Sequence, residues 1–169
     1  MKKFVLPLLA LASLSTASAA ERIGFFLLGG QYERDLNATD SFRVGLGLPL
    51  VGFVDGASGG YFSGDVAWLR HTRPLNAAGR GTQPYYGGGL GLAGAFVSSG
   101  GESASGLTIY PHVLGGANFG LNDRWALFAE GSVGANIYTG GVRTSVGSGS
   151  TSGVTVGFGL RLGATYRIR

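Results

Sequence analysis

The stretch VTVGFGLRLGATYRI, residues Val154–Ile168, decides the fold class of this 169-residue chain. Every second residue from Val154 to Ile168 is apolar, and the positions between them hold Thr, Gly and Arg. Successive side chains of a β-strand point to opposite faces, so this period of two predicts a strand with one apolar face and one face of small or polar residues. The same split recurs in residues 41–51 and 88–97. The sequence therefore predicts an all-β protein.

The composition excludes several classes of protein. The chain has no Cys, which rules out a disulfide scaffold, a thiolate metal site and a Cys nucleophile. Its sequence pI is about 9.7, but the arginines are scattered singly and form no basic stripe, so we expect no nucleic-acid partner. With 33 Gly and 13% charged residues, the chain is unlike an ordinary soluble domain.

The N-terminus has the pattern of a secretory signal peptide. Lys2 and Lys3 precede an apolar run over residues 4–14, which is followed by the small-residue sequence Ala17-Ser18-Ala19. The apolar run is shorter than the roughly 20 residues that a membrane-spanning helix needs. We expect residues 1–19 to be removed on export, which leaves one β-barrel domain over residues 20–169.

Seven runs along the exported chain have strand character. They cover residues 22–29, 41–51, 61–70, 88–97, 107–119, 124–138 and 154–168. Turn-forming stretches lie between them, of which residues 120–123 are expected as a periplasmic turn and residues 139–153 as a long outer loop. Bacterial single-chain barrels have an even number of strands, so we expect eight. The missing strand is expected either in a hairpin hidden in residues 41–58 or in a short strand over 141–146.

The small-residue face predicts the orientation of the strands. Gly weakens a solvent-facing strand, but it fits the crowded interior of a narrow barrel. We therefore predict an antiparallel up-and-down transmembrane β-barrel, with the apolar face toward lipid and the small residues in the lumen. Six aromatic residues lie near strand ends, where interfacial girdles are expected: Trp68, Tyr85, Tyr86, Trp125, Tyr138 and Tyr166.

Four charged residues lie in mid-strand on the small-residue face: Arg43, Asp65, Glu130 and Arg161. In a lumen without bulk water, isolated charges are costly, and here the two signs balance. The sequence predicts a lumen charge network of these four residues, with the pairing left open. The alternative is that they are solvent-exposed charges of a soluble sheet.

Two runs resemble a known family. The sequences YYGGGLGL over residues 85–92 and GLNDRWALFAE over residues 120–130 are similar to the Gly-rich strand and the short periplasmic turn of small outer-membrane β-barrels of the OmpA/OmpX type. The resemblance implies a place in the outer membrane of a diderm bacterium, contact with outer-membrane lipid and insertion by the barrel-assembly machinery.

The sequence offers little for catalysis. It has two histidines, His71 and His112, and neither belongs to the His-x-Ser element or the Asp–His cluster of outer-membrane enzymes. His112 shares a face with Tyr110 and Asn118, which favours a lumen hydrogen-bond network. We predict no catalytic, cofactor-binding or metal-binding residues and no cofactor, so the protein is not expected to be an enzyme.

Two functions remain open at this stage. The first is an outer-membrane barrel with a structural or surface-interaction role, closed to solutes because eight strands leave a filled interior. The second is a soluble periplasmic or secreted β-barrel that binds a small apolar ligand in an apolar interior.

Overall fold

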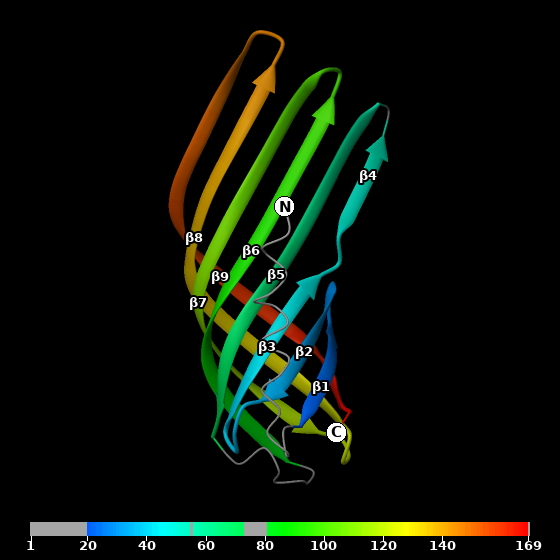
Figure 1. The fold of residues 1–169 in the computed structure, drawn as a ribbon, viewed down its shortest axis with the longest axis vertical. Helices are drawn as coiled ribbons and strands as arrows, with labels where there is room; N and C mark the ends of the chain where they lie inside the picture. Colours follow the sequence, from blue (N-terminus) through cyan, green and yellow to red (C-terminus); the bar gives the residue numbers. More distant parts are fainter. Residues whose placement is uncertain (1–19, 55, 73–80, 169) are drawn as a thin grey trace, which may run out of the picture.

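The computed structural model describes residues 20–54, 56–72 and 81–168, so the predicted signal peptide lies outside the described residues. The described chain forms one antiparallel sheet of nine strands (Figure 1). The strands are β1 (Glu21–Phe26), β2 (Gly29–Asp35), β3 (Asp40–Gly47), β4 (Leu50–Val54), β5 (Ala57–His71), β6 (Thr82–Ser99), β7 (Glu102–Gly120), β8 (Trp125–Thr144) and β9 (Gly147–Arg167). In this part of the chain no helix is long and apolar enough to cross a membrane.

The sheet closes on itself. β1 pairs with β9 and β3 pairs with β5, so neighbours in the chain are neighbours around the barrel. β3 and β4 lie one after the other along the same edge of β5, with Leu46 opposite Gly64 and Leu50 opposite Tyr61. From Leu46 to Leu50 the chain advances four residues, while β5 advances three, from Gly64 to Tyr61. This extra residue makes a β-bulge near Pro49, which has no N–H to donate. β3 and β4 thus act as one interrupted strand, and the predicted up-and-down barrel of eight strands is confirmed.

The strand missing from the seven predicted runs is β2. Both positions expected for it, a hairpin in residues 41–58 and a short strand over 141–146, were wrong. β3 and β4 in residues 41–58 are collinear rather than a hairpin, and residues 141–144 extend β8. β2 has the sequence GGQYERD, in which Gln31, Glu33 and Asp35 point into the lumen and are buried. It has no apolar period to detect, because its outward positions are Gly30, Tyr32 and Arg34.

The prediction of a long outer loop over residues 139–153 was also wrong. β8 continues to Thr144 and β9 begins at Gly147, so only residues 145–146 form the turn. The region from 98 to 106 is likewise a tight hairpin, in which Gly100 and Gly101 have φ of 58° and 86°. Positive φ at both central residues is the requirement of a type I′ turn. These strand ends are rich in Gly, Ser and Thr and lack an apolar face, so their sequence resembles that of a loop.

The barrel has two levels, because its strands differ in length. β1, β2 and β3 have 6, 7 and 8 residues, whereas β5 to β9 have 15 to 21. Figure 1 shows three long hairpins, β4–β5, β6–β7 and β8–β9, that continue well past the tip of β1 and β2. We call the level at which β1, β2 and β3 complete the wall the closed ring, and the parts of β4 to β9 beyond it the open sheet.

An apolar band covers the outer surface. Leu160 and Phe158 are 78% and 82% exposed, whereas the lumen residue Arg43 is 1% exposed. The band runs from Trp125 to Ile137 on β8, and Ile137 lies opposite Ile109 of β7 and Val154 of β9. Beyond that level the outward positions of β8 and β9 hold Thr, Gly, Arg and Ser, whereas β4, β5 and β6 still carry Phe53, Phe62 and Phe96. At about 3.3 Å per residue and a tilt of about 40°, this band is roughly 30 Å tall, close to the thickness of a bilayer core.

Candidate functional site in the lumen

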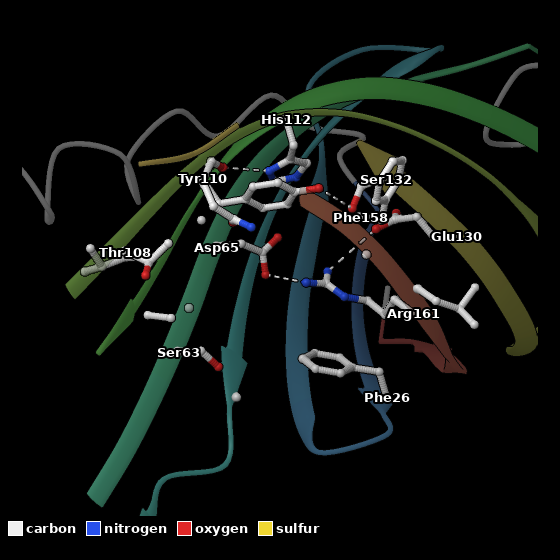
Figure 2. Close-up of a pocket in the computed structure, with 18 of the residues that line it drawn as sticks. Phe26, Ser63, Asp65, Thr108, Tyr110, His112, Glu130, Ser132, Phe158 and Arg161 are labelled. Carbon is white, nitrogen blue, oxygen red and sulfur yellow. Dashed lines mark hydrogen bonds and ion pairs between the residues drawn. The ribbon is translucent and has the colours of Figure 1, made fainter. Parts of the chain in front are cut away.

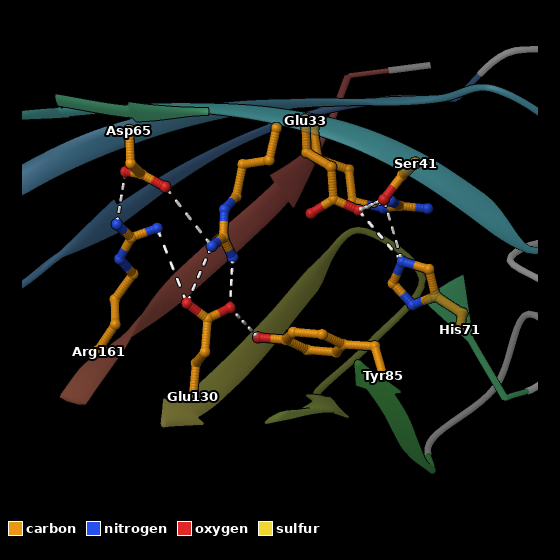
Figure 3. Close-up of polar contacts among 9 residues, drawn as sticks. Glu33, Ser41, Asp65, His71, Tyr85, Glu130 and Arg161 are labelled. Carbon is orange, nitrogen blue, oxygen red and sulfur yellow. Dashed lines mark hydrogen bonds and ion pairs between the residues drawn. The ribbon is translucent and has the colours of Figure 1, made fainter. Parts of the chain in front are cut away.

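A chain of four charged side chains crosses the lumen (Figure 3). Both terminal nitrogens of Arg43 donate to the carboxylate of Glu130, with Nη2 to Oε1 at 2.9 Å. Arg161 Nη2 donates to Asp65 Oδ1 at 2.6 Å. Longer contacts connect the two pairs, since Arg43 Nη2 lies 3.7 Å from Asp65 Oδ2 and Arg161 Nη1 lies 4.0 Å from Glu130 Oε1. The four residues named from the sequence lie within one contact network.

The strand register brings these charges together from two walls. Glu130 of β8 lies opposite Arg161 of β9, and Asp65 of β5 lies opposite Gly45 of β3. A Cβ atom at Gly45 would overlap the Asp65 carboxylate. The small residues of the inner face therefore leave the space in which charged side chains from opposite walls meet.

Tyr85 belongs to this network, and its expected place in an aromatic girdle was wrong. It is 5% exposed, and its hydroxyl donates to Glu130 Oε2 at 3.1 Å. Its neighbour Tyr86 points outward and is 51% exposed, as alternation along a strand requires. Near the chain terminus, Trp125 and Tyr166 form an exterior aromatic pair with ring centroids 5.0 Å apart.

A second polar cluster lies at the end of the lumen where both termini of the described chain meet, and the sequence analysis missed it. Arg22 Nη1 lies 2.7 Å from Glu33 Oε1 and 2.9 Å from Asp35 Oδ1. Ser41 donates to Glu33 Oε1 at 2.8 Å and lies 3.2 Å from Nε2 of His71. The sequence signal for this cluster was the spacing of Gln31, Glu33 and Asp35, because polar residues at every second position also mark one face of a strand.

The arrangement of Ser41, His71 and Glu33 does not suit nucleophilic catalysis. In a catalytic triad the acid holds His Nδ1 while Nε2 accepts the Ser proton. Here Glu33 contacts Nε2, at 3.5 Å, and accepts the Ser41 hydroxyl, while His71 Nδ1 has no hydrogen-bond partner. Ser41 is fully buried, so a substrate cannot reach it. The cluster is a buried ion-pair network of the barrel wall.

Tyr110 and His112 also point into the lumen. Their rings stack with centroids 4.7 Å apart, and Tyr110 Oη lies 3.3 Å from Ser132 Oγ and 3.2 Å from the Gly157 carbonyl oxygen. Asn118, which was expected in the same network, lies further along β7 opposite Phe128 of β8. Among the described residues, no group of three or more His, Asp and Glu side chains is arranged to hold a metal ion.

A cavity of about 290 Å³ is lined in part by three members of the charge network, Asp65, Glu130 and Arg161 (Figure 2). Its lining includes the polar residues Asp65, Tyr110, His112, Ser132, Asn136 and Arg161. Its margin includes Phe26 at the end of β1, Gly47 at the end of β3, and Phe158 and Leu160 of β9. These margin residues surround the place where β1 and β2 stop, so the cavity borders the gap in the barrel wall.

Comparisons with known proteins bear on the fold. No protein-family model matches the chain, and no curated protein matches it. The chain is similar to the crystal structure of a major outer membrane protein from Thermus thermophilus, with a TM-score of 0.51 and 16% identity over 89% of this chain and 98% of that one. It also matches CarO2 and CarO of Acinetobacter baumannii, with TM-scores of 0.45 and 0.40, identities of 12% and 11%, and coverage of 88% of this chain and of 97% and 95% of those chains.

At this identity, the likeness to the Thermus protein concerns the fold alone. Together with the closed strand order, the apolar outer band and the charged lumen, it defines the class: this chain has the fold of a small outer-membrane β-barrel.

Proposed function

We propose that the protein is an outer-membrane β-barrel of a diderm bacterium, with a structural or surface-interaction role and no passage for solutes. The observation that carries this proposal is the apolar band around a lumen that holds buried charges. Such an inverted distribution suits a barrel in lipid, where polar groups must be satisfied internally. It disfavours a soluble barrel with an apolar interior, because the inner wall of the closed ring carries Arg22, Glu33, Arg43 and Glu130.

The packing of the lumen supports the absence of a solute pathway. Ala67, Leu69, Tyr85 and Leu114 form a buried cluster in the closed ring, and Arg43 with Glu130 spans the lumen beside it. An eight-stranded barrel has an interior just wide enough for side chains to fill.

The open sheet supports a role at the surface. The β6–β7 and β8–β9 hairpins end in segments rich in Gly, Ser and Thr that extend past the apolar band. In the proposed orientation these ends face away from the periplasm, because both termini of the described chain lie at the opposite end of the barrel. The proposed partners of the chain are outer-membrane lipid and the barrel-assembly machinery that would insert it.

Three measurements test this proposal. Fractionation of cells should recover the protein with outer membranes, and a carbonate wash should leave it there. Folded protein should migrate differently from boiled protein on a denaturing gel, as resistant barrels do. In planar bilayers the purified protein should give no stable conductance steps. Recovery in the aqueous fraction would contradict the membrane location, and large steady steps would contradict the closed lumen.

A further inference from the structure

The wall of the barrel has a lateral gap at the height of the apolar band. β9 pairs with β1 only over Gly163–Arg167, so its part from Gly147 to Leu162 has β8 as its one strand partner in the described chain. On the other side of the gap, β5 is the one described strand that pairs with β4. The band on β9 extends from Tyr166 to Val154, and the tip of β1–β2 reaches only Leu162, whose carbonyl accepts a hydrogen bond from Leu27. The gap therefore faces the level at which lipid chains lie.

The gap leads into the cavity above Asp65 and Arg161, which both line it. Phe26, Phe158 and Leu160 form an apolar margin, and Phe158 and Leu160 are among the most exposed apolar residues of the chain. Behind this margin lie the carboxylate of Asp65, the guanidinium of Arg161 and the hydroxyl of Tyr110. Polar side chains behind an apolar entrance match the two parts of an amphiphilic molecule, because each part finds groups of its own kind.

Two buried polar atoms beside the cavity lack hydrogen-bond partners. Asp65 has a side chain only 10% exposed, and its Oδ2 atom accepts no hydrogen bond. Arg161 Nη1 donates none, although it lies 4.0 Å from Glu130 Oε1. An unsatisfied acceptor and an unsatisfied donor are costly when buried. A small rotation of either side chain would turn the atom toward the cavity, where a ligand hydroxyl can satisfy both kinds of atom because it both donates and accepts.

The charge balance of the cavity favours an uncharged head group. Arg43 and Arg161 offset Asp65 and Glu130 within one contact network. An anionic or cationic head would add an unbalanced charge to this low-dielectric site, and such a charge is expensive to bury. The volume of about 290 Å³ holds a small head group and lies at the lower end of the range for ligand pockets.

From these observations we propose that the lateral gap and the cavity behind it bind a single-chain amphiphile with an uncharged, hydroxyl-bearing head. The head lies between Asp65, Arg161 and Tyr110, and the acyl chain passes over Phe158 and Leu160 into the bilayer. This inference rests on the proposed membrane location, and it adds a binding site to a barrel whose lumen is closed below that site.

The test uses the full exported chain in phosphatidylcholine nanodiscs, with tritiated 1-monooleoylglycerol as the probe. Wild-type protein should retain the probe saturably, at about one molecule per barrel above empty nanodiscs. Ser63→Trp places an indole in the cavity and should reduce retention at least tenfold. Phe62→Trp is the matched control, because Phe62 is the next residue on β5 but points outward and lies outside the cavity lining. It should bind as wild type does.

A change of charge should change the preferred head group. Asp65→Asn leaves the network with an excess positive charge, so the ratio of oleate to monooleoylglycerol retained should rise about tenfold. Thr108→Trp, at another lining position, serves as a second cavity-filling variant if Ser63→Trp does not fold. Gel mobility without boiling verifies the fold of each variant.

The outcomes separate the two proposals. Barrels that enter nanodiscs and resist denaturation but retain no saturable probe would overturn the amphiphile site and leave the membrane location standing. Equal retention by wild type and a folded cavity-filling variant would do the same, as would competition by free glycerol without an acyl chain. A chain that never enters nanodiscs would contradict the membrane location itself.

Discussion

The closed ring and the open sheet share the long strands β5 to β9 but are stabilised differently. In the ring each strand pairs on both edges, and the lumen is filled by ion pairs such as Arg43 with Glu130 and Arg22 with Glu33. In the open sheet β4 and the upper part of β9 each have one neighbour among the described strands, and the inner face carries mainly Ala, Gly, Ser and Thr, without ion pairs of this kind among the described residues. The comparison indicates that side-chain contacts across the lumen hold the ring, whereas strand pairing within and between the hairpins holds the sheet.

The largest effect is expected from breaking the ion pair of the ring. Glu130→Ala leaves the buried Arg43 without its carboxylate and removes the acceptor of the Tyr85 hydroxyl. Removal of one partner of a buried pair costs about 3–5 kcal/mol. Urea titration of folded protein in detergent micelles, followed by gel mobility, measures this loss of unfolding free energy.

The double variant Arg43→Ala with Glu130→Ala should cost less than the sum of its parts, because neither charge is then left alone. Strictly additive losses would argue against a coupled pair.

The next largest effect is expected from a charge on the outer face, which should cost more within the apolar band than in the sheet beyond it. Val133→Arg places a charge on the outer face of β8 between Val113 and Phe158, and near the midplane this costs about 2–4 kcal/mol. Thr139→Arg, on the same face of the same strand above the band, should cost about 0–1 kcal/mol. Folding yield into lipid vesicles compares the two. Equal yields would place the bilayer at a different height on the barrel.

A smaller effect should follow from filling the inner face of the ring. Gly45→Ala forces the Asp65 carboxylate away from its contact with Arg161, and overpacking of this kind costs about 1–3 kcal/mol. Gly131→Ala is the control, because a Cβ there meets nothing within 4 Å. Thermal unfolding in micelles should separate the two variants. If the control lost as much stability, strand propensity rather than lumen packing would explain both results.

The smallest effect on the whole barrel is expected at a hairpin tip. Gly101 has φ of 86°. A Val at this positive φ is strained, so Gly101→Val should destabilise the turn locally by about 1–2 kcal/mol. The strain should fray the ends of β6 and β7 without loosening the ring, because local openings need not cross the whole structure. Hydrogen exchange should quicken at Ser98 and Ser103 and stay unchanged at Phe128. Faster exchange at Phe128 would mean that sheet and ring unfold as one unit.

Several features of this protein could be predicted from the sequence. The period of two in residues 154–168 indicates strands. Alternation of Gly with Leu along these strands indicates a narrow barrel, with the Gly face toward the lumen and the Leu face toward lipid. The same parity put Arg43, Asp65, Glu130 and Arg161 on one face. These inferences succeed because side-chain alternation is a local property of the extended backbone.

Other features depended on the tertiary structure. β2 lacked an apolar period because its outer face carries Gly30, Tyr32 and Arg34. Tyr85 and Tyr86 could not be assigned to lumen and exterior from the predicted strand over residues 88–97, because β6 begins earlier, at Thr82. The pairing of Arg43 with Glu130, 87 residues apart, and the gap left by a short β1–β2 hairpin arise only when the sheet closes. Closure determines which strand ends meet, and no local pattern of residues records that long-range register.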